Sequence, residues 1–261
     1  MIDKSLLRDE IQKCVSEAME RGELQADAID ILKRGFARCH INSNQGSTLL
    51  LTGINPSFIP KHGWPGEVED IPVQNPSGRY WLNKVSQFGE DLWPSMSYMD
   101  LFPRRESKHE GGFEKTFRNA NRFRGELLKI TQDEVERLAP RLIVHANRAS
   151  MYYWGIKPKT KFGQDTNNYI DPWMGYKVER VGFCDGMPQC MKEYDRLKRF
   201  PLYKVIGFID SEERINKDKY PKATSLNYIM EYVMEYREDK DKKTLYKSDD
   251  WKEILEWIVE H

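Results

Sequence analysis

Apolar positions follow two different spacings along the chain. Short apolar runs typical of strands occur at four places: 47–52, 97–102, 141–146 and 204–209. Residues 176–183 alternate weakly between apolar and polar and are a further candidate strand. Apolar residues recur at helical spacing in the remaining segments: 3–38 (two helices separated at Gly22), 79–88, 114–138, 147–153, 223–236 and 249–260. Because strands alternate with helices, the sequence predicts a parallel sheet with helices on both faces.

This pattern predicts an α/β fold in three layers, α/β/α, around a central, mainly parallel four-stranded sheet. Additional helices are expected at both ends of the chain. Residues 1–45 are expected to form an N-terminal helical extension, 46–236 the α/β domain, and 237–261 a charged linker and a C-terminal helix. The 261 residues suffice for one large domain or two small ones.

The loop after the first strand is the strongest candidate for a functional site, because ligands of parallel sheets bind at the carboxyl ends of the strands. This loop begins Gly53-Ile54-Asn55-Pro56-Ser57. Gly53 permits close approach of the backbone, and Pro56 restricts Asn55 to extended geometry. The Asn55 amide can both donate and accept hydrogen bonds. The alternative is an ordinary turn at the end of a strand.

The charge of the chain bears on whether the protein binds nucleic acid. The 41 basic and 41 acidic residues balance, so no overall basic character indicates nucleic-acid binding, although a local patch can provide it. The basic stretch between Arg104 and Arg124 is either such a patch or a solvated helix face.

The four cysteines lack the spacing of zinc or iron–sulfur ligands, so no metal is expected. Few cysteines, no apolar leader and no long apolar run favour a cytoplasmic protein without membrane contact.

Several segments resemble one known family. The strand and motif Leu49–Pro56 are similar to the first motif of the uracil-DNA glycosylase superfamily, and look most like the mismatch-specific branch, which reads Gly-Ile-Asn-Pro-Gly. Downstream, Gly78-Arg79-Tyr80-Trp81 resembles the Asn-Arg-Phe-Trp that opens that family's next helix. Tyr98–Leu101 and Leu138–Val144 are similar in order and character, so the resemblance spans roughly residues 47 to 210.

The resemblance implies hydrolysis of the N-glycosidic bond of a damaged or mismatched base, with DNA as the partner and no cofactor. It assigns to Asn55 the positioning of the water that attacks the sugar C1′. The residues expected to bind the substrate are Gly53, Ile54, Pro56, Ser57, Phe58, Trp64, His145 and Asn147. For His145, at the end of the third strand, a hydrogen-bonded structural role is the alternative. For Asp100, which ends the second strand, ligand contact and turn formation are both open.

One motif of the family has no counterpart. A His-Pro-Ser or Asn-Pro-Ser loop is expected after the last sheet strand, but Asp210-Ser211-Glu212-Glu213 follows 204–209, and these acids would repel phosphates. The segment Cys184–Pro188 does not match either, and Asn75-Pro76-Ser77 matches but lies too early. The sequence therefore leaves two alternatives to a glycosylase. One is an inactive member of the fold that binds a nucleobase, a nucleotide or a protein, and the other is an unrelated α/β enzyme. Nothing in the sequence specifies an oligomeric state.

Overall fold

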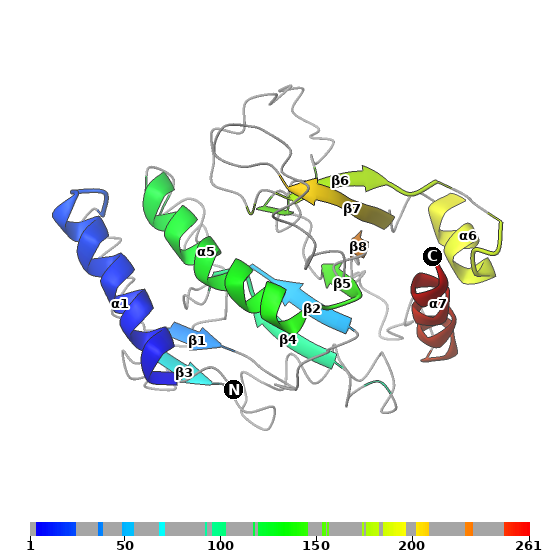
Figure 1. The fold of residues 1–261 in the computed structure, drawn as a ribbon, viewed down its shortest axis with the longest axis horizontal. Coiled ribbons are helices and arrows are strands. Elements are labelled where there is room, and N and C mark those ends of the chain that lie inside the picture. Colours follow the sequence, from blue (N-terminus) through cyan, green and yellow to red (C-terminus); the bar gives the residue numbers. More distant parts are fainter. Residues whose placement is uncertain are drawn as a thin grey trace, which may run out of the picture.

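The computed structural model has a mixed α/β architecture (Figure 1). It describes these residues of the chain: 4–24, 36–38, 49–54, 68–70, 92, 96–102, 117, 120–145, 153–154, 156, 174, 176–182, 185–196, 202–208, 228–231 and 248–261. Among them, no helix is both long and apolar enough to cross a membrane.

A six-stranded sheet forms the centre of the described structure. From edge to edge, its strands are β4 (Met96–Asp100), β2 (Leu49–Gly53), β5 (Leu142–His145), β8 (Tyr228–Glu231), β7 (Leu202–Phe208) and β6 (Tyr176–Arg180). The first four are parallel to one another, whereas β7 is antiparallel to β8 and β6 is antiparallel to β7. The sheet is thus mostly parallel, as predicted, but it has six described strands where the sequence predicted four.

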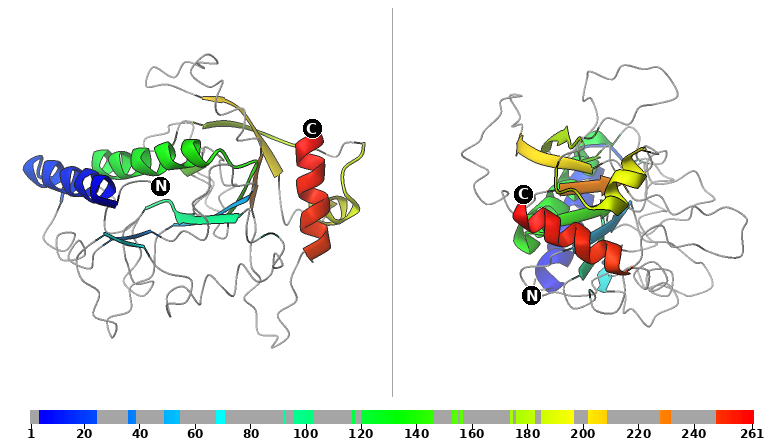
Figure 2. Two further views of the ribbon diagram at one scale, coloured as in Figure 1. Left: turned by 60° about the horizontal axis from the view of Figure 1, so that its bottom comes forward. Right: turned by 90° about the vertical axis from the view of Figure 1, so that its right-hand side faces the viewer.

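Alternate residues of the parallel strands enter two hydrophobic clusters. Leu50 and Ile143 belong to the first cluster, together with residues of α1 (Lys4–Glu20) and α5 (Asn121–Leu138). Leu51 and Val144 belong to the second, together with residues of α6 (Gln189–Arg196) and α7 (Ser248–Glu260). Figure 2 shows α7 on the other side of the parallel strands from α1 and α5. Because both faces are covered, β2, β4 and β5 are buried along their whole length, which is why they read as continuous apolar runs.

The C-terminal helix is part of this core. Ile254 of α7 is fully buried in the second cluster, whereas Val259 of the same helix is 54% exposed. We expect Ile254→Ala to lower the free energy of unfolding by about 2–5 kcal/mol, because it leaves a cavity. The matched variant Val259→Ala should change it by less than about 0.5 kcal/mol. Urea unfolding measures both values, and equal effects would show that α7 does not pack as described.

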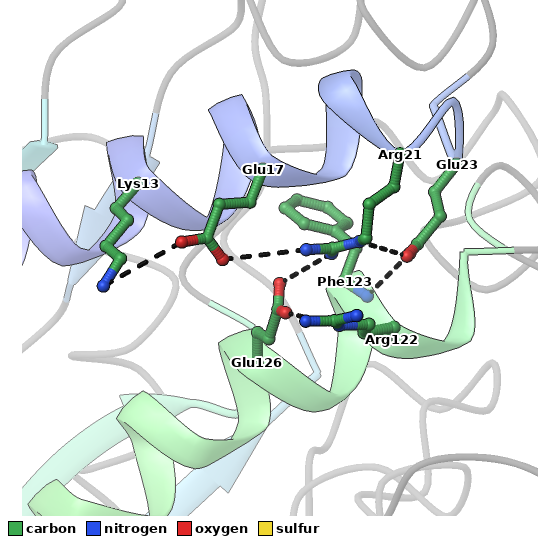
Figure 3. Close-up of polar contacts among 7 residues, drawn as sticks. All are labelled: Lys13, Glu17, Arg21, Glu23, Arg122, Phe123 and Glu126. Carbon is green, nitrogen blue, oxygen red and sulfur yellow. Dashed lines mark hydrogen bonds and ion pairs between the residues drawn. The ribbon is translucent and has the colours of Figure 1, made fainter.

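The N-terminal helix is attached to α5 by ion pairs as well as apolar contacts (Figure 3). After α1, the chain turns at Gly22, whose φ of +68° suits glycine, at the predicted break. Arg21 then bridges two carboxylates, donating to Glu23 over 2.6 Å and to Glu126 of α5 over 2.9 Å. The other oxygen of Glu23 accepts a hydrogen bond from the backbone N–H of Phe123 over 3.0 Å. Glu23 therefore satisfies one of the free amide groups in the first turn of α5.

This contact predicts a measurable loss of stability. The variant Glu23→Ala should lower the free energy of unfolding by about 1 kcal/mol, the usual value of a lost helix cap. Asp133→Ala serves as the control, because its ion pair with Lys129 is exposed and should contribute less than about 0.5 kcal/mol. Chemical denaturation of the two variants tests the difference. If Glu23→Ala were no more destabilising than Asp133→Ala, the bond to Phe123 would have no structural role.

Two predicted elements are wrong. Residues Phe36–Arg38, assigned to the second helix, form β1, which pairs in parallel with β3 (Val68–Asp70), between the first predicted strand and the helix predicted from residue 79. The predicted helix over 223–236 contains strand β8. Its residues Tyr228, Ile229 and Met230 are all buried, so they lack the alternation that distinguishes a strand from a helix in sequence.

The other elements agree more closely with expectation. The predicted strands at 47–52, 97–102, 141–146 and 204–209 are β2, β4, β5 and β7, and the candidate strand at 176–183 is β6. The long predicted helix begins at Asn121 rather than at 114, and α6 was not predicted. The predicted helix over 79–88 lies outside the described residues, as does the one over 147–153 except for its last residue.

Candidate functional site

The carboxyl ends of β2 and β5 define the candidate site. Within this sheet the chain continues from β2 to β4 on one side, whereas after β5 it continues to β6, β7 and β8, which all lie on the other side. Strand order therefore reverses between β2 and β5. In open parallel sheets such a reversal leaves a crevice outside the strand ends, where ligands bind. Gly53 and His145, the last residues of these two strands, lie at this place.

The backbone that leads into the Asn55 motif is held by the neighbouring strand. The N–H of Leu101 donates to the carbonyl of Gly53 over 3.1 Å, and that of Phe102 donates to the carbonyl of Ile54 over 2.8 Å. The pairing between β2 and β4 thus continues past the end of the strands. The position from which residue 55 leaves the sheet is fixed by these two bonds.

Helix α5 contacts three segments through buried polar side chains, and one of these segments, at Leu101, follows the end of β4. Thr131 donates to the carbonyl of Leu101 over 2.6 Å, and Gln132 donates to the carbonyl of Met174 over 3.1 Å. The Arg124 guanidinium lies 3.4 Å from the Tyr153 hydroxyl. All three side chains are at most 6% exposed, so their hydrogen bonds are shielded from water and hold these segments against α5.

His145 is enclosed on the face of the sheet that α5 covers. Its side chain is fully buried, with Nδ1 2.9 Å from the Thr52 hydroxyl and the ring edge-on to Trp154 at 5.3 Å. Trp154 in turn stacks on Tyr176, with centroids 5.6 Å apart. Burial lowers the pKa of His145 to about 3, so the ring is neutral at ordinary pH. This environment favours the structural alternative for His145, and its contact with a substrate stays a prediction.

Asp100 lies on the opposite face, beside the motif. It pairs in register with Gly53 and is only 6% exposed. The hydroxyl of Tyr98 donates to its carboxylate. This bond fixes the carboxylate orientation at the strand end, whether or not Asp100 contacts a ligand.

The structure brings together three of the predicted site residues. Gly53, Ile54 and His145 meet at the carboxyl edge of β2 and β5. The others, Asn55, Pro56, Ser57, Phe58, Trp64 and Asn147, lie outside the described residues. Sequence reasoning missed the bracing residues of α5. Thr131 and Gln132 follow the apolar pair Leu127 and Leu128 on the buried side of an amphipathic helix. Polar residues at these otherwise apolar positions were the signal from which buried hydrogen bonds could have been predicted.

The acidic segment 210–213 lies outside the described residues, but the strand that precedes it is described. The segment follows β7, which runs antiparallel to β8, so β7 ends at the edge opposite to Gly53. The last parallel strand is β8, and Glu231 at its end pairs in register with His145. The residues after it read Tyr232-Val233-Met234-Glu235, so no His-Pro-Ser or Asn-Pro-Ser follows this strand either. β7 therefore does not end at the candidate site, and the sequence still departs from the family's second motif.

Other reactive groups lie elsewhere in the described structure. Cys14 and Cys190 are half-buried, and burial is the main cause that raises the pKa of each thiol to about 11, which keeps them protonated. Within the described ranges, no group of three or more histidine, cysteine or carboxylate side chains is arranged to hold a metal ion. In comparisons with known proteins, no family model matches the sequence and no curated protein matches it.

Proposed function

We propose that this chain is a uracil-DNA glycosylase-like hydrolase with a three-layer α/β/α domain, which removes a damaged or mismatched base from DNA. The observation that supports it most is the position of Gly53 and Ile54. These residues open the motif that resembles the family, and they leave the sheet where strand order reverses. The bonds from Leu101 and Phe102 supply the rigidity that a water-positioning turn requires.

The reaction we propose needs no cofactor. The base is first flipped out of the DNA stack into the crevice beside the motif, where Phe58 or Trp64 stacks on it. Asn55 orients a water toward C1′. The water oxygen forms a bond to C1′ as the C1′–N bond breaks, the base departs with the bonding electrons, and the water's proton passes to solvent. Catalysis then rests on positioning and electrostatics rather than on a strong base.

Base release from oligonucleotides tests this function. The purified chain is incubated with single-stranded and duplex oligonucleotides that carry uracil, hypoxanthine or an alkylated base, and with duplexes that carry a G·T mismatch. Abasic sites are then detected by alkaline cleavage. Release of at least one of these bases is expected. A folded protein that releases none of them would contradict the proposal.

The second candidate is a member of the same fold that binds a nucleobase, nucleotide or protein without hydrolysis. The sequence after β8 favours it, because the family's second motif is missing there too. This candidate predicts binding without product. If the ligand is a nucleic acid, the affinity should fall steeply with salt concentration, because phosphate contacts release counterions.

A further inference from the structure

We infer that Thr52 and His145 form a positioning pair that fixes the end of β2, from which the Asn55 motif begins. The role of this pair in catalysis rests on the proposed function. Its role in holding the end of β2 does not depend on that function.

The pair joins β2 and β5, the two strands between which strand order reverses. Thr52 is the residue before Gly53 and pairs in register with His145, the last residue of β5. Both side chains are fully buried, and the distance from the Thr52 hydroxyl to Nδ1 is 2.9 Å. The bond therefore crosses from β2 to β5 at the last position before the motif.

The adjacent pair on the same face shows why this polar contact is informative. Two residues earlier, Leu50 pairs in register with Ile143, and both are fully buried and apolar. An apolar pair at 52 and 145 would avoid the cost of burying polar groups. A hydrogen bond, unlike an apolar contact, is directional and fixes the rotamers of both partners. Its occurrence only at the last step before the turn points to a positioning role.

The end of β2 is then held from both neighbouring strands. On the β4 side, Leu101 and Phe102 hold the carbonyls of Gly53 and Ile54. On the β5 side, His145 holds the side chain of Thr52, and its own ring is packed against Trp154. The neutral state of the buried imidazole keeps this bond unchanged over the pH range of most assays.

The test separates positioning from stability. In the double variant Thr52→Val with His145→Leu, both partners become apolar, so global stability should be kept or raised. We nevertheless expect kcat for base release to fall about 10- to 100-fold with KM within about 3-fold, because misplacement of the turn affects the reacting geometry. Thr52→Ser, which keeps the hydroxyl, should retain kcat within about 3-fold, and Ile143→Val is the matched apolar control on the same strand pair.

Amide hydrogen exchange provides a measurement that needs no activity. Exchange at residues 53–55 should become at least about 10-fold faster in the double variant and stay unchanged in Ile143→Val. Unchanged exchange at residues 53–55 in the double variant would overturn the inference. So would a decrease in kcat that is fully explained by a smaller folded fraction. A Thr52→Ser variant with the same kcat and exchange rates as the double variant would also overturn it. If the wild-type chain releases no base, the proposed function fails, and the exchange rates still decide whether the pair holds the turn.

Discussion

Replacing Asn55 by alanine is expected to lower the rate of base release by at least about 100-fold while the protein stays folded. The amide is proposed to orient the attacking water, and the loss of one such positioned group typically costs two to three orders of magnitude in kcat. The carbonyls of Gly53 and Ile54 are held by Leu101 and Phe102, and the substitution removes neither of these bonds, so we expect the end of β2 to stay in place. Single-turnover base release, with circular dichroism to verify folding, measures the effect.

The chain supplies a matched control for this variant. Asn75-Pro76-Ser77 repeats the tripeptide Asn55-Pro56-Ser57 at a place that the proposed mechanism does not use. Asn75→Ala should therefore release base at the wild-type rate, within about 3-fold. A fully active Asn55→Ala protein would remove Asn55 from the mechanism, and equal losses in both variants would show that the effect is not specific to the motif.

The second large effect is a loss of stability in acid that originates at His145. The folded protein keeps this ring neutral, with a pKa of about 3, whereas in the unfolded chain the pKa is near its ordinary value of 6.5. Between these values the unfolded state binds a proton that the folded state does not. The free energy of unfolding should therefore fall as the pH falls below 6.5, by about 1.4 kcal/mol per pH unit from this residue, and the residue should add no slope above 6.5.

Comparison with a protein that lacks the imidazole isolates this contribution from that of the carboxylates. The double variant Thr52→Val with His145→Leu should lose about 2 kcal/mol less than the wild type between pH 6.5 and pH 5, and the two proteins should show parallel profiles from pH 7 to 8. Urea denaturation at each pH provides the values. Identical slopes below pH 6.5 would mean that His145 is accessible to protons in the folded protein.

Local patterns in the sequence predicted most of the sheet. The apolar runs that became β2, β4 and β5 are bounded by glycine, proline or charged residues, so their boundaries were visible. β8 was not recognised, because a short buried strand has no alternation and its flanking apolar residues suit a helix. The three-residue strands β1 and β3 are too short to show any period.

The candidate site was predictable only in part. The rule that ligands bind at the carboxyl ends of parallel strands located Gly53 and Ile54. The bond between Thr52 and His145 depends on the register of two strands whose bonded residues are 93 positions apart, which no local pattern reveals. The end of strand 204–209 was expected beside the site for the same reason, because the direction of β7 follows from its pairing with β8 and not from its own sequence.

A crystal structure of the full chain with an oligonucleotide that contains an abasic site, together with free uracil, tests the central claim most directly. The account predicts that the Asn55 side chain faces a cavity at the carboxyl edge of β2 and β5, with its amide within hydrogen-bonding distance of a water beside C1′. An Asn55 side chain packed into the protein interior, with no cavity beside it and the DNA bound elsewhere, would contradict the account.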